Sequence, residues 1–202
     1  MSLPGFPTSQ LPGFKKDLNL KRIIIDFLLK FAGKNHSKSY KIVSVIFGAI
    51  LFLVLAPAVL TATGLFLKDY IPVQINRVIE LTAAATSIAC GLYFLMWAAI
   101  MQWKIGEGTP APNAPTRRLV ITGPYKYCRN PVQLGAILYY FGVGIFIAGA
   151  AAGIINFILG FAAGSFYHKF IEEKELEERF GEEYRRYRKN TPFLFPKIKL
   201  KR

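Results

Sequence analysis

The segment GPYKYCRNP (residues 123–131) separates two pairs of long apolar segments and ends in Asn130-Pro131. Asparagine is a favoured N-cap, and proline is favoured at the first helical position because its missing N–H would be unpaired there. The step therefore predicts a helix that begins at Pro131. A helix N-terminus suits a ligand carboxylate or phosphate, because it has unpaired N–H groups and a positive dipole end. A loop that simply ends before a membrane helix would have the same pattern.

Four apolar segments approach or exceed the roughly 20 residues that a membrane-spanning helix needs. They comprise residues 42–67, 78–103, 132–148 and 153–170. Pro57 predicts a kink in the first, which neighbouring helices can accommodate. Gly149 to Gly153 predicts a tight turn between the last two, which would then form a helical hairpin. Glu80 lies near one end of the second segment, where we expect it to be interfacial rather than functional.

The charges are kept apart from these apolar segments. The chain is 52% hydrophobic, yet it has 26 Lys and Arg against 12 Asp and Glu, a net charge of +14. A nucleic-acid-binding protein would spread such charge over a soluble face, whereas segregation from long uncharged segments is typical of a membrane protein. Cys90 and Cys128 are the only cysteines, and they suggest neither a disulfide framework nor a metal site.

Four spans would place both termini and the central loop on one side of the membrane. Residues 1–41, 104–131 and 168–202 contain 8, 5 and 11 of the 26 cations, or 24 in all. Because Lys and Arg accumulate in cytoplasmic loops, the loop and both termini are predicted to be cytoplasmic.

The two ends of the chain contain further predicted helices. Residues 18–31 are amphipathic, which fits a helix in the membrane interface or one packed on the protein's own soluble parts. Residues 171–190 predict a charged helix with a bend at Gly181, supported by the pairs Glu175–Arg179 and Glu182–Arg186.

The predicted class is therefore an all-α integral membrane protein. It has about four transmembrane helices, an N-terminal amphipathic helix and a cytoplasmic C-terminal helix. We divide it into a tail and interfacial helix (1–41), two transmembrane helices (42–103) and a catalytic half (104–202). Within the last, residues 119–121 suggest one short extended piece, and residues 192–196 an apolar return towards the membrane.

Opposite charges are predicted to meet on the cytoplasmic face. The central loop contributes cations and the helix start, and Glu172-Glu173 follows the fourth apolar segment. A pocket with a cationic and an anionic pole suits a zwitterionic ligand. The loop cations are Arg117, Arg118, Lys126 and Arg129. The alternative is that these groups are solvated charges at a membrane surface.

The chain resembles the isoprenylcysteine carboxyl methyltransferase and phospholipid methyltransferase family in four features taken together. They are the motif GPYKYCRNP, the helical hairpin, Glu172-Glu173 and FGEEY (residues 180–184). The resemblance covers about residues 104–197. It implies an integral membrane enzyme that uses S-adenosyl-L-methionine to methylate a carboxylate or amine of a lipidic or prenylated acceptor, without metal or nucleic acid.

The resemblance also implies roles for individual residues. The implied cofactor-binding residues are Leu119, Val120, Tyr125, Asn130, Pro131, Gln133 and Glu172. The implied catalytic residues are Arg129, Glu173 and His168. The chain departs from the family at Asn130, where the family has histidine, and at Gln133, where it has tyrosine. His168 stands where the prenylcysteine enzymes have an arginine that holds the substrate, which weakens a prenylcysteine assignment more than cofactor binding.

Two other functions share parts of this pattern. Membrane sterol and steroid reductases have a similar Arg-(His/Asn)-Pro step and a late glutamate-rich helix, but they use NADPH and usually have more spans. A non-catalytic membrane adaptor would use the amphipathic helix and the basic ends on anionic lipid. Binding of S-adenosylmethionine, of NADPH or of neither separates the three hypotheses.

Overall fold

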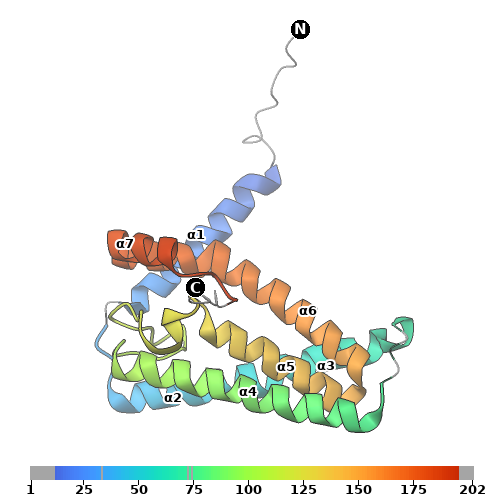
Figure 1. Cartoon of the computed structure of the whole chain (residues 1–202). Helices are drawn as coiled ribbons and strands as arrows, with labels where there is room; N and C mark the ends of the chain where they lie inside the picture. Colours follow the sequence, from blue (N-terminus) through green and yellow to red (C-terminus); the bar gives the residue numbers. More distant parts are fainter. Residues whose placement is uncertain (1–11, 33, 72, 74, 196–202) are drawn as a thin grey trace, which may run out of the picture.

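The computed structural model describes residues 12–32, 34–71, 73 and 75–195, and no strand occurs within that part. Four helical stretches are long and apolar enough to cross a membrane. They are Lys38–Tyr70, Arg77–Lys104, Pro131–Ala148 and Ala150–Asn190. The predicted class of an all-α membrane protein with four spans is confirmed. Figure 1 shows the spans as a bundle, with the charged C-terminal helix lying across one end.

The first span is one continuous helical stretch with a wider turn in its middle. It consists of α2 (Lys38–Ile50), a π-helical turn (Leu51–Leu55), α3 (Ala56–Leu67) and a final 3₁₀ turn (Lys68–Tyr70). Ser37 caps α2, because its hydroxyl accepts a hydrogen bond of 3.2 Å from the backbone N–H of Tyr40.

Pro57 explains the wider turn in this span. A proline in a helix lacks an N–H and frees the carbonyl four residues earlier, which here belongs to Leu53. The Tyr139 hydroxyl donates to that carbonyl oxygen at 3.0 Å. The predicted disturbance at Pro57 is therefore accommodated by the π-helical turn that precedes it and by a neighbouring helix.

The central helix of the bundle is α5 (Pro131–Ala148). In its most apolar stretch of 18 residues, 56% of the residues are buried, against 11–33% in the corresponding stretches of the other three spans. It packs closely on α4 (Arg77–Lys104) through facing glycines. A Cβ atom built on Gly91 would lie 2.7 Å from the Gly135 carbonyl oxygen and 2.6 Å from the Tyr139 nitrogen. The absence of side chains at this crossing thus allows the backbones to touch.

The hairpin between α5 and α6 (Ala150–Tyr167) is confirmed, but its turn is shorter than predicted. Only Gly149 is non-helical, with φ 88°, and the residues up to Gly153 already belong to α6. A glycine is favoured there because a side chain is strained at positive φ.

Glu80 stabilises the start of this second hairpin helix. Its Oε1 accepts a hydrogen bond of 2.8 Å from the Ala150 N–H, and its Oε2 pairs with Arg77 at 3.1 Å. The side chain is only 11% exposed. Through these two contacts it caps α6 and neutralises the charge of Arg77. That agrees with the interpretation of Glu80 as a residue of the membrane boundary.

Asn156 is a buried polar residue within the membrane that the sequence analysis did not single out. Its Nδ2 donates to Thr61 Oγ1 of α3 at 2.9 Å and to the Tyr140 carbonyl oxygen of α5 at 3.1 Å. One amide therefore joins three helices, as polar side chains do in membrane bundles.

The last helix continues from α6 without a break. A π-helical turn (His168–Glu172) leads directly into α7 (Glu173–Asn190), whereas a helix over 171–190 was predicted. Gly181, with φ 50° and ψ −123°, confirms the bend.

The two ion pairs predicted for α7 have different outcomes. The pair Glu175–Arg179 is confirmed at 2.7 Å. The pair Glu182–Arg186 is wrong, because Glu182 binds Arg185 at 2.6 Å, one position earlier on the same helical face.

The N-terminal helix, α1 (Pro12–Ala32), packs on the protein's own C-terminal helix, which is one of its two predicted environments, whereas a place in the membrane interface stays a prediction. Ile25 and Leu28 are buried where α1 meets α7 and the π-helical turn, and Arg22 pairs with Glu178 at 2.8 Å. Ile23 and Phe27 are exposed. In Figure 1, the N-terminal end of α1 projects away from the bundle, and the helix then passes α7 on its way to α2.

The glycine crossing of α4 and α5 gives a stability prediction. Gly91→Val should destabilise the protein by about 1–3 kcal/mol, because the new side chain must push two backbones apart. Ala89→Val, on the exposed face of the same helix, should change stability little. Unfolding of the detergent-purified variants would measure both. Equal stabilities would contradict the close crossing.

Candidate functional site

The loop between α4 and α5 is irregular and is held to the helices on both sides. Lys41 of α2 donates to the Glu107 carbonyl oxygen at 2.6 Å, and Arg179 of α7 donates to that of Thr116. Residues 119–121, suggested as extended, form no strand. Near its end the loop forms a 3₁₀ turn, Gly123–Lys126, which includes Tyr125 of the candidate site.

Tyr125 lies at the centre of this site, held by the second span, α4, and by the C-terminal helix, α7. Gln102 of α4 donates to its hydroxyl at 2.6 Å, and the Tyr187 hydroxyl of α7 donates to its carbonyl oxygen at 2.7 Å. Val120 and Ala98 pack against it. Burial, and to a lesser extent the nearby carboxylate of Glu172, raises the pKa of the Tyr125 phenol well above its usual value. The phenol is therefore neutral at physiological pH.

The predicted helix start at Pro131 is confirmed, but Asn130 does not cap it with its side chain. The backbone of Asn130 occupies the N-cap position, while its Nδ2 donates to the Phe193 carbonyl oxygen at 3.0 Å. The returning C-terminal segment thus competes for the amide that would otherwise cap the helix. The first intrahelical bond is donated by Leu134, so the N–H groups of Val132 and Gln133 precede it.

Arg129 joins the loop to both ends of α7. Its Nη2 pairs with Glu173 at 2.6 Å, and its Nη1 donates to the carbonyl oxygens of Arg188 and Thr191 at 2.6 and 3.0 Å. The two charged side chains are 12% and 15% exposed. Arg129 and Glu173, both predicted to be catalytic, therefore bind each other and hold α7 against the loop.

The apolar return of the chain is confirmed as far as residue 195. Leu194 is 2% exposed and packs with Cys128, Leu134 and Ile137, and the Phe195 ring stacks on Phe161. Burial raises the pKa of the Cys128 thiol to about 11, so this cysteine is neutral and inert at physiological pH.

His168 and Glu172 are paired across the π-helical turn between α6 and α7. Nδ1 of His168 and Oε2 of Glu172 are in hydrogen-bond contact. The turn is closed by the Glu173 N–H, which donates to the His168 carbonyl oxygen five residues earlier. Such turns are frequent at functional sites because they reorient side chains within a continuous helix. The sequence analysis did not find this turn, since its residues all favour an ordinary helix.

Three buried polar atoms near these residues have no partner within the described part of the chain. They are Gln102 Oε1, Gln133 Oε1 and Arg129 Nε. Gln133 is bound through Nε2 to Ser165 Oγ at 3.1 Å, which leaves its oxygen as a free acceptor. A buried polar group without a partner is costly unless a ligand or water completes it. Two acceptors and one donor suit a ligand that has amine or hydroxyl groups and a carboxylate.

The remaining loop cations fit the alternative prediction, that these groups are solvated charges. Arg117 and Arg118 are 42% and 71% exposed, and both pair with Glu107, at 3.6 and 2.8 Å. Lys126 is also exposed. These residues are solvated charges rather than one wall of a pocket.

Comparison with known proteins identifies the family of the chain. The model of the phospholipid methyltransferase family matches residues 79–183, just over half of the chain. The chain therefore belongs to this family of membrane proteins. The match begins within α4 and ends within α7, so it contains Tyr125, Arg129, Gln133 and the His168–Glu172 pair, but not Tyr187 or the segment that returns after α7.

Two curated relatives each match a little under half of the chain. The chain is 33% identical over 96 residues to methanethiol S-methyltransferase 1 of Bradyrhizobium diazoefficiens (46% of this chain, 29% of that protein). It is 30% identical over 89 residues to protein-S-isoprenylcysteine O-methyltransferase of Mus musculus (43% and 30%). The aligned part thus spans less than a third of either relative, and both relatives are methyltransferases.

The Arg129–Glu173 pair gives a stability prediction. Arg129→Met should destabilise the protein by about 3–5 kcal/mol, because the buried Glu173 carboxylate loses its partner. Arg185→Met removes a half-exposed arginine from α7 and should change stability much less, because surface ion pairs contribute little. Denaturant unfolding in detergent would compare them. Equal losses would contradict the role assigned to Arg129.

Proposed function

We propose that the protein is an S-adenosylmethionine-dependent methyltransferase whose acceptor is a lipidic or prenylated molecule of the membrane. The observation that carries the proposal is the cluster of Tyr125, Gln133 and the His168–Glu172 pair where α4, α5 and the π-helical turn meet. Buried acceptors without partners, an aromatic wall and a carboxylate suit this zwitterionic, adenosine-containing cofactor. Family membership supports the same reaction class.

The residues of the chain divide the binding task by chemistry. Tyr125 offers an aromatic surface, with Leu119 and Val120 contributing backbone groups beside it. The N–H groups at the start of α5, after Asn130-Pro131, suit the cofactor's carboxylate. Glu172, Gln102 and Gln133 offer acceptors for its ammonium and hydroxyl groups. A further donor is Nε of Arg129.

When bound, the cofactor supplies a methyl group attached to a sulfonium sulfur. After the transfer, the remainder of the cofactor is a neutral thioether. No general acid is needed, so the protein's main task is to align the reactants and exclude water. Proximity and orientation contribute about 7–11 kcal/mol in favourable cases. The ion pair of Arg129 and Glu173 contributes to this task because it holds α7 against the loop. Both residues therefore act by positioning other groups.

His168 is the residue placed to accept a proton. With its Nδ1 donating to Glu172, Nε2 is left as an acceptor, and an amine acceptor must be deprotonated before it attacks. A carboxylate acceptor needs no base. Glu173, the other candidate base, is neutralised by Arg129 at 2.6 Å, so His168 with Glu172 is the better candidate.

The lipidic acceptor would approach between helices, and the soluble cofactor from the side on which the central loop and α7 lie. We infer that this side is cytoplasmic, because residues 1–41, 104–131 and 168–202 contain 24 of the 26 Lys and Arg.

Calorimetric titration with S-adenosylhomocysteine tests the cofactor assignment. We expect saturable binding that is weakened at least about tenfold in Glu172→Gln, since an acceptor to the ligand ammonium loses its charge. Glu182→Gln on the exposed face of α7 is the matched control and should bind normally. Binding of NADPH instead would favour a reductase, and binding of neither ligand a non-catalytic adaptor. Unchanged affinity in Glu172→Gln would refute the role of Glu172.

Cysteine labelling tests the orientation. In a background in which Cys90 and Cys128 are replaced by serine, Arg118→Cys and Tyr70→Cys place single thiols at opposite ends of the spans, at sites that are 71% and 78% exposed. A membrane-impermeant maleimide should label the first only in inside-out vesicles and the second only in right-side-out vesicles. The reverse pattern would overturn the cytoplasmic assignment.

A further inference from the structure

A groove lies between α2 and the C-terminal end of α4, apart from the candidate methyl-transfer site. It has a volume of about 340 Å³, within the range of about 300–1,000 Å³ typical of ligand sites. Ile42 and Ile46 line one wall, and Ala99, Ile100 and Trp103 line the other. Lys104 lies at its end, where α4 ends.

The groove exists because α2 is held mainly by the loop rather than by direct packing on α4. Asn113 donates to the Ser44 hydroxyl at 3.0 Å, Lys41 donates to the Glu107 carbonyl oxygen at 2.6 Å, and Gly48 lies against Ala111. The loop thus spaces the two helices and leaves an apolar channel open to the bilayer.

The charge around the groove is positive. None of the ion pairs within the described residues involves Lys104, and Lys38 at the start of α2 is exposed. Glu107, the carboxylate closest to Lys104 in the sequence, is held by Arg118 at 2.8 Å and by Arg117 at 3.6 Å. The positive dipole end of α2 and the negative dipole end of α4 both lie at this end of the groove and oppose each other, so the positive charge comes from the lysines. Trp103 beside Lys104 is typical of the membrane interface, where lipid head groups lie.

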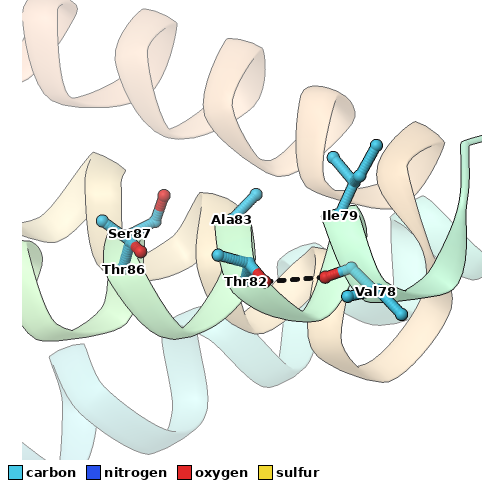
Figure 2. Close-up of a pocket in the computed structure, with 6 residues that line it drawn as sticks. All are labelled: Val78, Ile79, Thr82, Ala83, Thr86 and Ser87. Atoms are coloured by element: carbon cyan, nitrogen blue, oxygen red, sulfur yellow. Dashed lines mark hydrogen bonds between the residues drawn. The ribbon is translucent and has the colours of Figure 1, made fainter.

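A second hollow on the same helix lacks these features. It has a volume of about 420 Å³ and lies nearer the N-terminus of α4 (Figure 2). Val78, Thr82 and Ala83 are among its lining residues, none of which is charged, and the Thr82 hydroxyl is bound to the Val78 carbonyl oxygen of its own helix at 2.8 Å. It therefore serves as an internal comparison.

We propose that the groove between α2 and α4 binds an anionic phospholipid of the surrounding bilayer. An acyl chain occupies the apolar channel, and the phosphate head group lies against Lys104 at the membrane surface. Basic pockets between transmembrane helices on the cytoplasmic side bind such head groups. The site is separate from the proposed cofactor site and does not depend on its assignment.

Trp103 allows the groove to be monitored directly. The chain has two tryptophans, so Trp97→Phe leaves Trp103 as the only one. This protein would be reconstituted into phosphatidylcholine vesicles that contain a minor fraction of acyl-brominated lipid, either phosphatidylglycerol or phosphatidylcholine. Bromine quenches tryptophan fluorescence only at close range. We expect a relative binding constant about fivefold in favour of phosphatidylglycerol, as for one lysine near an anionic surface.

Two variants in that background test the assignment. Lys104→Gln should abolish the preference between head groups, and Ala99→Phe should reduce quenching by both lipids because it fills the channel. Ala83→Phe, which fills the hollow of Figure 2 instead, should leave the preference unchanged. Equal quenching by the two lipids, or a preference that survives Lys104→Gln, would overturn the proposal. Absence of quenching by either lipid would indicate that protein covers the groove, and would also overturn it.

Discussion

The structure depends on the rule that backbone polar groups in a bilayer must find partners within the protein. Pro57 frees the Leu53 carbonyl, and the Tyr139 hydroxyl of α5 satisfies it at 3.0 Å. The turn of the hairpin leaves the N–H groups at the start of α6 without partners in their own helix. Glu80 Oε1 accepts a hydrogen bond of 2.8 Å from one of them, that of Ala150. Each irregularity in a span is therefore also a contact between spans, which makes the bundle specific rather than merely apolar.

The same principle organises the end of the bundle where the central loop and α7 lie. There the chain cannot remain a regular helix, because it must turn back, and Arg129 supplies the donors that this requires. One guanidinium binds Glu173 at the start of α7 and two carbonyl oxygens at its end. A buried ion pair of this kind is a weak source of net stability, but removing one partner is costly. It thus fixes the position of α7 rather than adding much stability.

Holding α7 in place has a consequence for the chemistry. The π-helical turn brings His168 and Glu172 together, and the Glu172 carboxylate is near enough to Tyr125 to help raise the pKa of its phenol. Gln102 and Gln133 each have a buried oxygen without a partner among the described residues. A soluble, zwitterionic methyl donor and a membrane-embedded acceptor have opposite solubilities. A site formed between the polar helix α7 and the apolar hairpin of α5 and α6 can receive both the donor and the acceptor.

The sequence by itself determined the four spans, the helix start at Pro131, the hairpin and the bend at Gly181, because these follow from length, hydropathy and the backbone preferences of proline and glycine. It also contained the motif of the methyltransferase family. Only the tertiary structure decided that Asn130 binds Phe193 rather than capping its helix, that Arg129 binds Glu173, and that Gln102 supports Tyr125. Such pairings join residues from about 20 to about 60 positions apart. A local pattern does not specify them, because partner choice depends on which side chains the packed helices bring within hydrogen-bond distance.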